Sequence, residues 1–291
     1  MKLLKVFLLV FLGLSAVAQQ PVGPTVTIPV IASPSPRNPT GITADSLKVT
    51  DQNMPVTGAS LLRGAEFPLE LGVLIDTSDS QRRVRLDDLL KATSQFVGEI
   101  MHDPQDRLFS LQFDNAPHAT EWLTKEQWQS SKIKVRFGGA TALFDAVATA
   151  SKERMGPRDW HKPTRRVLLL ISDGGDNQSH VTFDDAVSEA LQTGTVIFTI
   201  ETDPSGPGRS LQGEKVLEKF ARLTGGESYT EIGKRALPNL FADIKGRLAG
   251  LYYLSYVPPD ASKRGLHYVE VKPAPREKLK LSYARKYFWN P

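Results

Sequence analysis

The chain has 291 residues, no cysteine and a formal net charge of +4. The lack of cysteine excludes disulfides, thiolate metal sites and thiol catalysis. The mild basic excess is spread along the chain without a dense Lys/Arg block, which argues against nucleic-acid binding. With 40% apolar and 23% charged residues, the composition is that of a globular protein with a buried core.

The first 18 residues have the pattern of an export signal. Lys2 and Lys5 precede a short apolar run over residues 6–14, and residues 15–18 end in a small-x-small sequence. The run is too short for a stable membrane anchor, so an uncleaved anchor is the weaker alternative. We expect cleavage after Ala18 and export to the periplasm or the extracellular space, with no membrane span in the mature protein.

The next two segments are small. Residues 19–43 are rich in Pro, Thr and Ser, which predicts a flexible leader. Residues 44–64 contain two short strand patterns joined by a polar turn at Asp51, Gln52 and Asn53, which predicts a small β element.

Residues 65–250 alternate apolar runs with amphipathic helical patterns. Strands are expected at residues 69–75, 107–113, 166–171 and 195–202, and helices at 83–101, 142–155, 183–191, 214–223 and 235–251. Strands that are apolar on both faces and alternate with helices call for a mostly parallel sheet flanked by helices. The fold class predicted is therefore α/β, doubly wound.

The C-terminal segment, residues 251–291, changes character. Its apolar and polar residues alternate over 252–257, 266–272 and 278–284, with prolines between the runs. This period of two is typical of antiparallel strands. We expect a small antiparallel β appendage built from the N-terminal and C-terminal segments together.

Three oxygen-bearing side chains follow the first strand of the α/β domain. Asp76, Ser78 and Ser80 lie just beyond its carboxyl end, where open α/β sheets bind ligands. Hard oxygen ligands suit Mg²⁺, or Mn²⁺ or Ca²⁺, better than zinc or copper. Alone the pattern is weak evidence, because Asp and Ser are also ordinary turn residues.

Two further segments strengthen this interpretation. Residues 171–176 (Ile-Ser-Asp-Gly-Gly-Asp) place Asp173 at the end of another buried strand, and residues 137–145 place Thr141 in a glycine-led loop before a helix. Together the three segments resemble the von Willebrand factor type A (VWA) domain and its metal-ion-dependent adhesion site (MIDAS). The resemblance implies metal ligands at Asp76, Ser78, Ser80, Thr141 and Asp173.

The resemblance covers nearly the whole mature chain. Residues 252–259 and 284–288 resemble the closing segments of exported bacterial VWA-related proteins, described mainly from acidobacteria. Gln81 is a departure, since many members have methionine there. The family implies a Rossmann-like fold and a binding module. A Glu or Asp of the partner would complete the coordination shell of its cation.

Three other acidic residues lie near these segments. Asp79 is expected to point outward at the rim, where it tunes partner choice. Asp145 either supports the Thr141 loop or complements the dipole of its helix. Asp176 either rims the site or caps a turn or helix. The histidines have no metal-ligand spacing and are expected at the surface: His102, His118, His161, His180 and His267.

The preferred function is an exported, non-enzymatic adhesion module that binds a protein. A metal-dependent hydrolase is the first alternative, but it needs a base or nucleophile beside the ion, and no G-x-S-x-G or phosphate-loop pattern is present. A structural scaffold in the cell envelope is the second. The sequence does not identify the partner or the oligomeric state.

Overall fold

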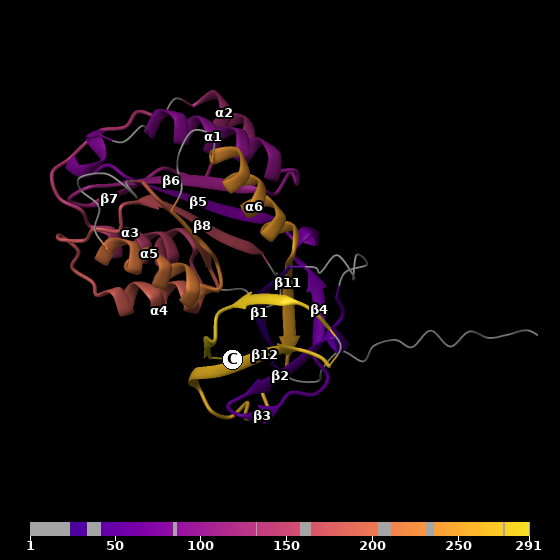
Figure 1. Ribbon diagram of the computed structural model, residues 1–291. Coiled ribbons are helices and arrows are strands. Elements are labelled where there is room, and N and C mark those ends of the chain that lie inside the picture. Colours follow the sequence, from indigo (N-terminus) through magenta and orange to yellow (C-terminus); the bar gives the residue numbers. More distant parts are fainter. Residues whose placement is uncertain are drawn as a thin grey trace, which may run out of the picture.

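The computed structural model shows a parallel sheet sandwiched between helices, with antiparallel sheets beside it (Figure 1). It describes residues 24–33, 42–83, 86–131, 133–157, 164–202, 211–230, 236–275 and 277–290. The signal segment lies outside these ranges. No helix within them is both long and apolar enough to cross a membrane.

The central sheet has six strands in the order β10-β9-β8-β5-β6-β7. Only β7 is antiparallel to its neighbour. The strands are β5 (Leu69–Asp76), β6 (Arg107–Phe113), β7 (Pro117–Ala119), β8 (Arg165–Ser172), β9 (Val196–Glu201) and β10 (Ser228–Tyr229). Every residue of β5 is buried, because strands cover both its edges and helices cover both its faces. The predicted doubly wound α/β fold is confirmed.

Helices cover both faces of this sheet. One face packs against α1 (Leu86–Ile100), α2 (Lys125–Ser130) and α6 (Leu237–Ala249). The other packs against α3 (Leu143–Thr149), its π-helical continuation Ala150–Met155, α4 (Phe183–Thr193) and α5 (Leu211–Thr224). Successive strand side chains point to opposite faces, so Val73 joins the first core and Leu74 the second.

Two four-stranded antiparallel sheets form the appendage. The first has the order β13-β1-β11-β4 and the second β14-β12-β2-β3. Their strands are β1 (Val26–Ser33), β2 (Leu47–Asp51), β3 (Met54–Pro55), β4 (Ser60–Arg63), β11 (Leu251–Tyr256), β12 (Gly265–Pro273), β13 (Lys280–Tyr283) and β14 (Lys286–Trp289); short 3-10 turns cover Ala44–Ser46, Gly64–Glu66 and Asp79–Arg83. Strands from both ends of the chain pair directly in each sheet, as the predicted appendage requires.

The expectation of a flexible leader is wrong for Val26–Ser33. This segment is β1, an interior strand that pairs with β11 on one side and β13 on the other. Its residues up to Ala32 are buried. Pro29 is tolerated there because β13 pairs only with residues 30–33, so Pro29 lies beyond its end and loses no ladder bond on that side.

A buried polar network crosses the second antiparallel sheet. The Asp51 carboxylate accepts hydrogen bonds from the hydroxyls of Tyr256 and Tyr287, and its Oδ1 lies 3.1 Å from His267 Nδ1. His267 Nε2 lies 2.7 Å from the Lys263 carbonyl oxygen. The Tyr287 hydroxyl also lies 3.2 Å from His267 Nδ1, so both ring nitrogens have polar partners inside the sheet. The expectation that His267 lies at the surface is wrong, because its side chain is 0% exposed.

Candidate functional site

The carboxyl ends of the parallel strands point away from the antiparallel sheets. The Tyr253 hydroxyl of β11 donates to the Thr164 carbonyl just before β8, and its ring packs on Phe67 just before β5. The amino ends of β5 and β8 thus face the appendage. Asp76 and Ser172, their last residues, lie at the opposite end of the sheet.

Asp76 is a buried carboxylate at this end of β5. Its Oδ1 accepts a hydrogen bond of 2.9 Å from the Ser78 backbone N–H, and its Oδ2 accepts one of 2.6 Å from the Ser172 hydroxyl. Burial, reinforced by the charge of Asp173, raises the pKa of Asp76 to about 6 although both serines favour the ionised form. A cation beside this carboxylate would reverse the effect of burial.

Ser80 connects the turn after β5 to the loop after β8. Its hydroxyl donates to Asp173 Oδ2 at 2.6 Å and lies 3.0 Å from the Ser78 hydroxyl. The Gln81 amide donates to the same Asp173 oxygen at 3.0 Å. Four of the five expected ligands therefore meet in one hydrogen-bonded group: Asp76, Ser78, Ser80 and Asp173.

A glycine shapes the loop that carries Asp173. Gly174 has a φ of +79°, and a Cβ there would lie 2.2 Å from the Gly213 carbonyl oxygen at the start of α5. The Gly174 backbone N–H donates to the Ser172 hydroxyl, and the Gly175 N–H donates to Asp173 Oδ1. These contacts fix the direction of the Asp173 carboxylate.

Thr141 lies in a loop that is tied to both ligand segments through its backbone. The Gly138 N–H donates to the Thr77 carbonyl at 2.9 Å, next to Asp76. The Thr141 N–H donates to Asn177 Oδ1, and the Thr141 carbonyl accepts from the Asn177 N–H. Thr141 is 7% exposed. The structure thus holds the loop beside the group by its backbone, with no direct hydrogen bond from the Thr141 hydroxyl to another described residue.

The three neighbouring acids have different surroundings. The Asp79 side chain is 60% exposed and pairs with Arg82. Asp176 accepts from the Phe144 N–H at the start of α3, so it caps this helix. Asp145 accepts from the backbone N–H groups of the two residues that follow Ser179, so it ties α3 to that loop and makes no hydrogen bond to the Thr141 loop.

Two participating residues were not expected from the sequence. Ser172 bridges Asp76 and the Gly174 backbone, and a serine directly before Asp173 was the only signal for it. Gln81 is 0% exposed, and its amide orientation follows from chemistry, because the Asp173 carboxylate can only accept. Its role was hidden because it departs from the usual family residue.

The residues present fit a hard divalent cation. Two carboxylates and the hydroxyls of Ser78, Ser80 and Thr141 form an all-oxygen donor set. The Gln81 Oε1 atom is buried without a hydrogen-bond partner in the described chain, and a bound ion or its water would relieve such an orphaned acceptor. No group of three or more His, Cys, Asp or Glu side chains within the described ranges could hold a metal, so a site here depends on the hydroxyls.

Comparisons with known proteins agree with this fold. The family model for the von Willebrand factor type A domain matches residues 70–236. No curated protein matches the sequence. A solved von Willebrand factor type A protein from Catenulispora acidiphila aligns with a TM-score of 0.50 at 11% identity, covering 91% of this chain and 73% of that one.

Two further solved structures are similar. Proximal thread matrix protein 1 from the mussel byssus, solved with a zinc-occupied MIDAS motif, has a TM-score of 0.53 at 16% identity and covers 67% of this chain and 49% of that one. An aerotolerance-related membrane protein from Bacteroides fragilis has a TM-score of 0.46 at 15% identity, covering 62% of this chain and 98% of that one. At such identities the mussel and Catenulispora structures support the fold alone.

Proposed function

The chain belongs to the von Willebrand factor type A domain family, and from that premise we propose that it is an exported module that binds another protein through a divalent cation. The proposed ligands are the side chains of Asp76, Ser78, Ser80, Thr141 and Asp173. Mg²⁺ is the proposed ion, with Mn²⁺ and Ca²⁺ as alternatives that the same oxygen donors accept.

One contact carries the proposal. The 2.6 Å hydrogen bond from Ser80 to Asp173 joins residues 93 positions apart in the sequence. It brings the ends of two neighbouring parallel strands to one point, next to a buried carboxylate whose pKa is raised to about 6. Two like charges held together in this way favour a cation between or beside them.

The charge of the ligand set defines the partner. Two carboxylates and three neutral hydroxyls leave room in the shell of a divalent ion for one more anionic oxygen. When bound, the ion would supply a positive charge for a carboxylate of the partner. The exposed Asp79, paired with Arg82 at 2.7 Å, lies at the rim and disfavours partners with further acidic residues there.

Calorimetric titration of the full chain with Mg²⁺, Mn²⁺, Ca²⁺ and Zn²⁺ tests the site. We expect one ion per chain and a loss of affinity of more than ~100-fold for Asp173→Ala, since even changes around a metal's direct ligands cost ~10–100-fold. Asp79→Ala is the matched control and should keep its affinity, because its side chain is 60% exposed and pairs with Arg82. Equal affinities in the two variants would contradict the ligand assignment.

A pull-down from the parent cell envelope, with and without EDTA, tests the adhesion step. The module should retain a protein with Mg²⁺ and release it in EDTA, and Asp173→Ala should not retain it. If chelation leaves the set of bound proteins unchanged while the titration still finds the ion, the ion is structural and the binding proposal fails.

A further inference from the structure

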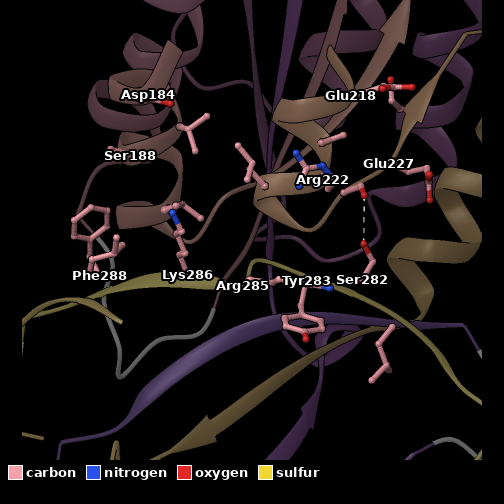
Figure 2. A pocket seen from close by; sticks show the side chains of 18 of the residues that line it. Asp184, Ser188, Glu218, Arg222, Glu227, Ser282, Tyr283, Arg285, Lys286 and Phe288 are labelled. Atoms are coloured by element: carbon pink, nitrogen blue, oxygen red, sulfur yellow. Dashed lines mark hydrogen bonds between the residues drawn. The ribbon is translucent and has the colours of Figure 1, made fainter. Parts of the chain in front are cut away.

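A cleft of about 880 Å³ lies between the α/β domain and the appendage, away from the proposed metal site. Helices α4 and α5 form one wall, and β13 and β14 form the other (Figure 2). Gly213 at the start of α5 packs against Gly174 beside the metal site, whereas Arg222 near its end lines the cleft. At 1.5 Å per residue the two places are about 13 Å apart along the helix.

Three sheets end at this cleft. Strands β10, β13 and β14 are each the terminal strand of their sheet. Ser228, Leu281 and Phe288 of these strands line the cleft in turn. Terminal strands present backbone N–H and C=O groups that no neighbouring strand pairs, and an extended peptide can add to them as a further strand.

The walls of the cleft are fixed relative to each other. The Ser282 hydroxyl of β13 donates to the carbonyl oxygens of Gly225 and Gly226 after α5, at 3.0 and 3.3 Å. Gly225 has a φ of +88°, and a Cβ there would lie 2.8 Å from the Cα of Tyr283. The two backbones therefore approach as closely as glycine allows, and the cleft is preformed.

The lining carries an excess of basic groups that lack partners. The side chains of Arg222 and Arg285 make no hydrogen bond or ion pair with any part of the chain that the structure describes. Both are exposed. The Lys286 ammonium lies 5.2 Å from the centre of the Tyr268 ring, in a cation–π contact that does not neutralise its charge. Lys280 also lines the cleft.

The acidic residues of the lining do not cancel this charge. Glu227 is already paired with Arg247 at 2.7 Å. In Figure 2, Asp184 and Glu218 lie near the top, on the helices and away from the strands. The basic side chains lie below them, nearer the strands: Arg222, Arg285 and Lys286. The strand edges and the basic side chains thus occupy the same part of the cleft.

We propose that this cleft binds an extended peptide segment of a partner protein that alternates Asp or Glu with apolar residues. The peptide backbone would pair with a terminal strand, its carboxylates would meet Arg222 and Arg285, and its apolar side chains would pack on the aliphatic part of the lining: Val187, Leu191, Leu223, Leu266 and Leu281. This contact is separate from the cation site and needs no metal.

Fluorescence anisotropy on the full chain in EDTA tests the proposal. The probe is a labelled octapeptide of alternating Glu and Val, and its matched peptide has Gln in place of every Glu. We expect the Glu peptide to bind, the Gln peptide to bind at least about tenfold more weakly, and Arg222→Glu/Arg285→Glu to weaken the Glu peptide at least about tenfold. Arg264→Glu, an exposed change outside the lining, should leave binding unchanged.

Three results would overturn the proposal. Equal binding of the Gln peptide would remove the charge argument, and equal binding by the doubly substituted variant would place the peptide elsewhere. Binding that appears only with Mg²⁺ and disappears in Asp173→Ala would assign the peptide to the cation site. Circular dichroism of the variants checks that the fold is kept, and the Arg222→Gln/Arg285→Gln variant, which adds no repulsion, should show the same direction of change.

Discussion

The substitution Asp76→Asn is expected to stabilise the cation-free protein at neutral pH while it removes cation binding. Asp76 is 0% exposed, and burial, together with the charge of Asp173, raises its pKa from 3.8 to about 6. Asparagine keeps the shape of the side chain, and its amide can still accept from the Ser78 N–H and donate to the Ser172 hydroxyl. It removes only the charge.

The sign and size follow from linkage. The pKa of Asp76 is higher in the folded chain, so its contribution to stability is fully present below pH 3.8 and is lost as the pH rises through about 6. A change in pKa from 3.8 to about 6 corresponds to about 3 kcal/mol. In EDTA, as the pH rises from 3.8 through about 6 to neutral, the free energy of unfolding of Asp76→Asn should increase by about 3 kcal/mol relative to that of the wild type.

Urea unfolding, followed by the fluorescence of the buried Trp128 and Trp289, measures this difference at each pH. Asp145→Asn is the control of opposite sign. Burial raises the pKa of Asp145, but the hydrogen bonds from His180 and Val181 outweigh burial, and the pKa lies below its ordinary value. The stabilising contribution of Asp145 is lost as the pH falls. The free energy of unfolding of Asp145→Asn should therefore drop relative to that of the wild type as the pH rises. A difference between Asp76→Asn and the wild type that does not change with pH would show that the pKa of Asp76 is not raised by burial.

Two further substitutions test the packing that holds the site and the appendage. Gly174→Ala should cost more than ~2 kcal/mol, because its Cβ would lie 2.2 Å from the Gly213 carbonyl oxygen. Gly58→Ala is the control and should cost only ~1 kcal/mol, because Gly58 also has a positive φ, +67°, but has open space around it. Equal costs of the two variants in thermal unfolding would contradict the close approach at Gly174. Asp51→Ala should cost about 3 kcal/mol or more in urea unfolding, because it leaves the buried hydroxyls of Tyr256 and Tyr287 and the buried His267 ring without their shared acceptor. A cost below ~1 kcal/mol would show that this network contributes little to stability.

The sequence was sufficient where the structure depends on local pattern. The continuous apolar run of β5 and the helical period of α1 predict a covered parallel sheet, and the sheet places the ends of β5 and β8 side by side. The strand order alone therefore brings Asp76 near Asp173. The turn at Gln52 and Asn53 was also recognisable, and both residues have positive φ.

Pairings between distant segments could not be predicted. Val26–Ser33 becomes an interior strand because β11 and β13, more than two hundred residues later, cover its two edges. Pro29 and the prolines of the flanking sequence suggest a leader when they are considered without those partner strands. His267 is buried for the same reason, since Asp51 reaches it only across the β2–β12 pairing.

The role of a polar side chain also depends on the loop that folds against it. Asp145 accepts hydrogen bonds from the backbone N–H groups of His180 and Val181, which come 35 and 36 residues later in the sequence. No local sequence pattern specifies these contacts. Gln81 reaches Asp173 in the same way. Local sequence identifies candidate ligands, while the contacts that orient them come from the assembled sheet.

The proposed function requires that one divalent cation binds where Ser80 meets Asp173. Anomalous diffraction from crystals of the chain grown with Mn²⁺ tests it most directly. We expect a single strong anomalous peak enclosed by oxygen atoms of five residues: Asp76, Ser78, Ser80, Thr141 and Asp173. No peak there, or a peak held by other side chains, would contradict it.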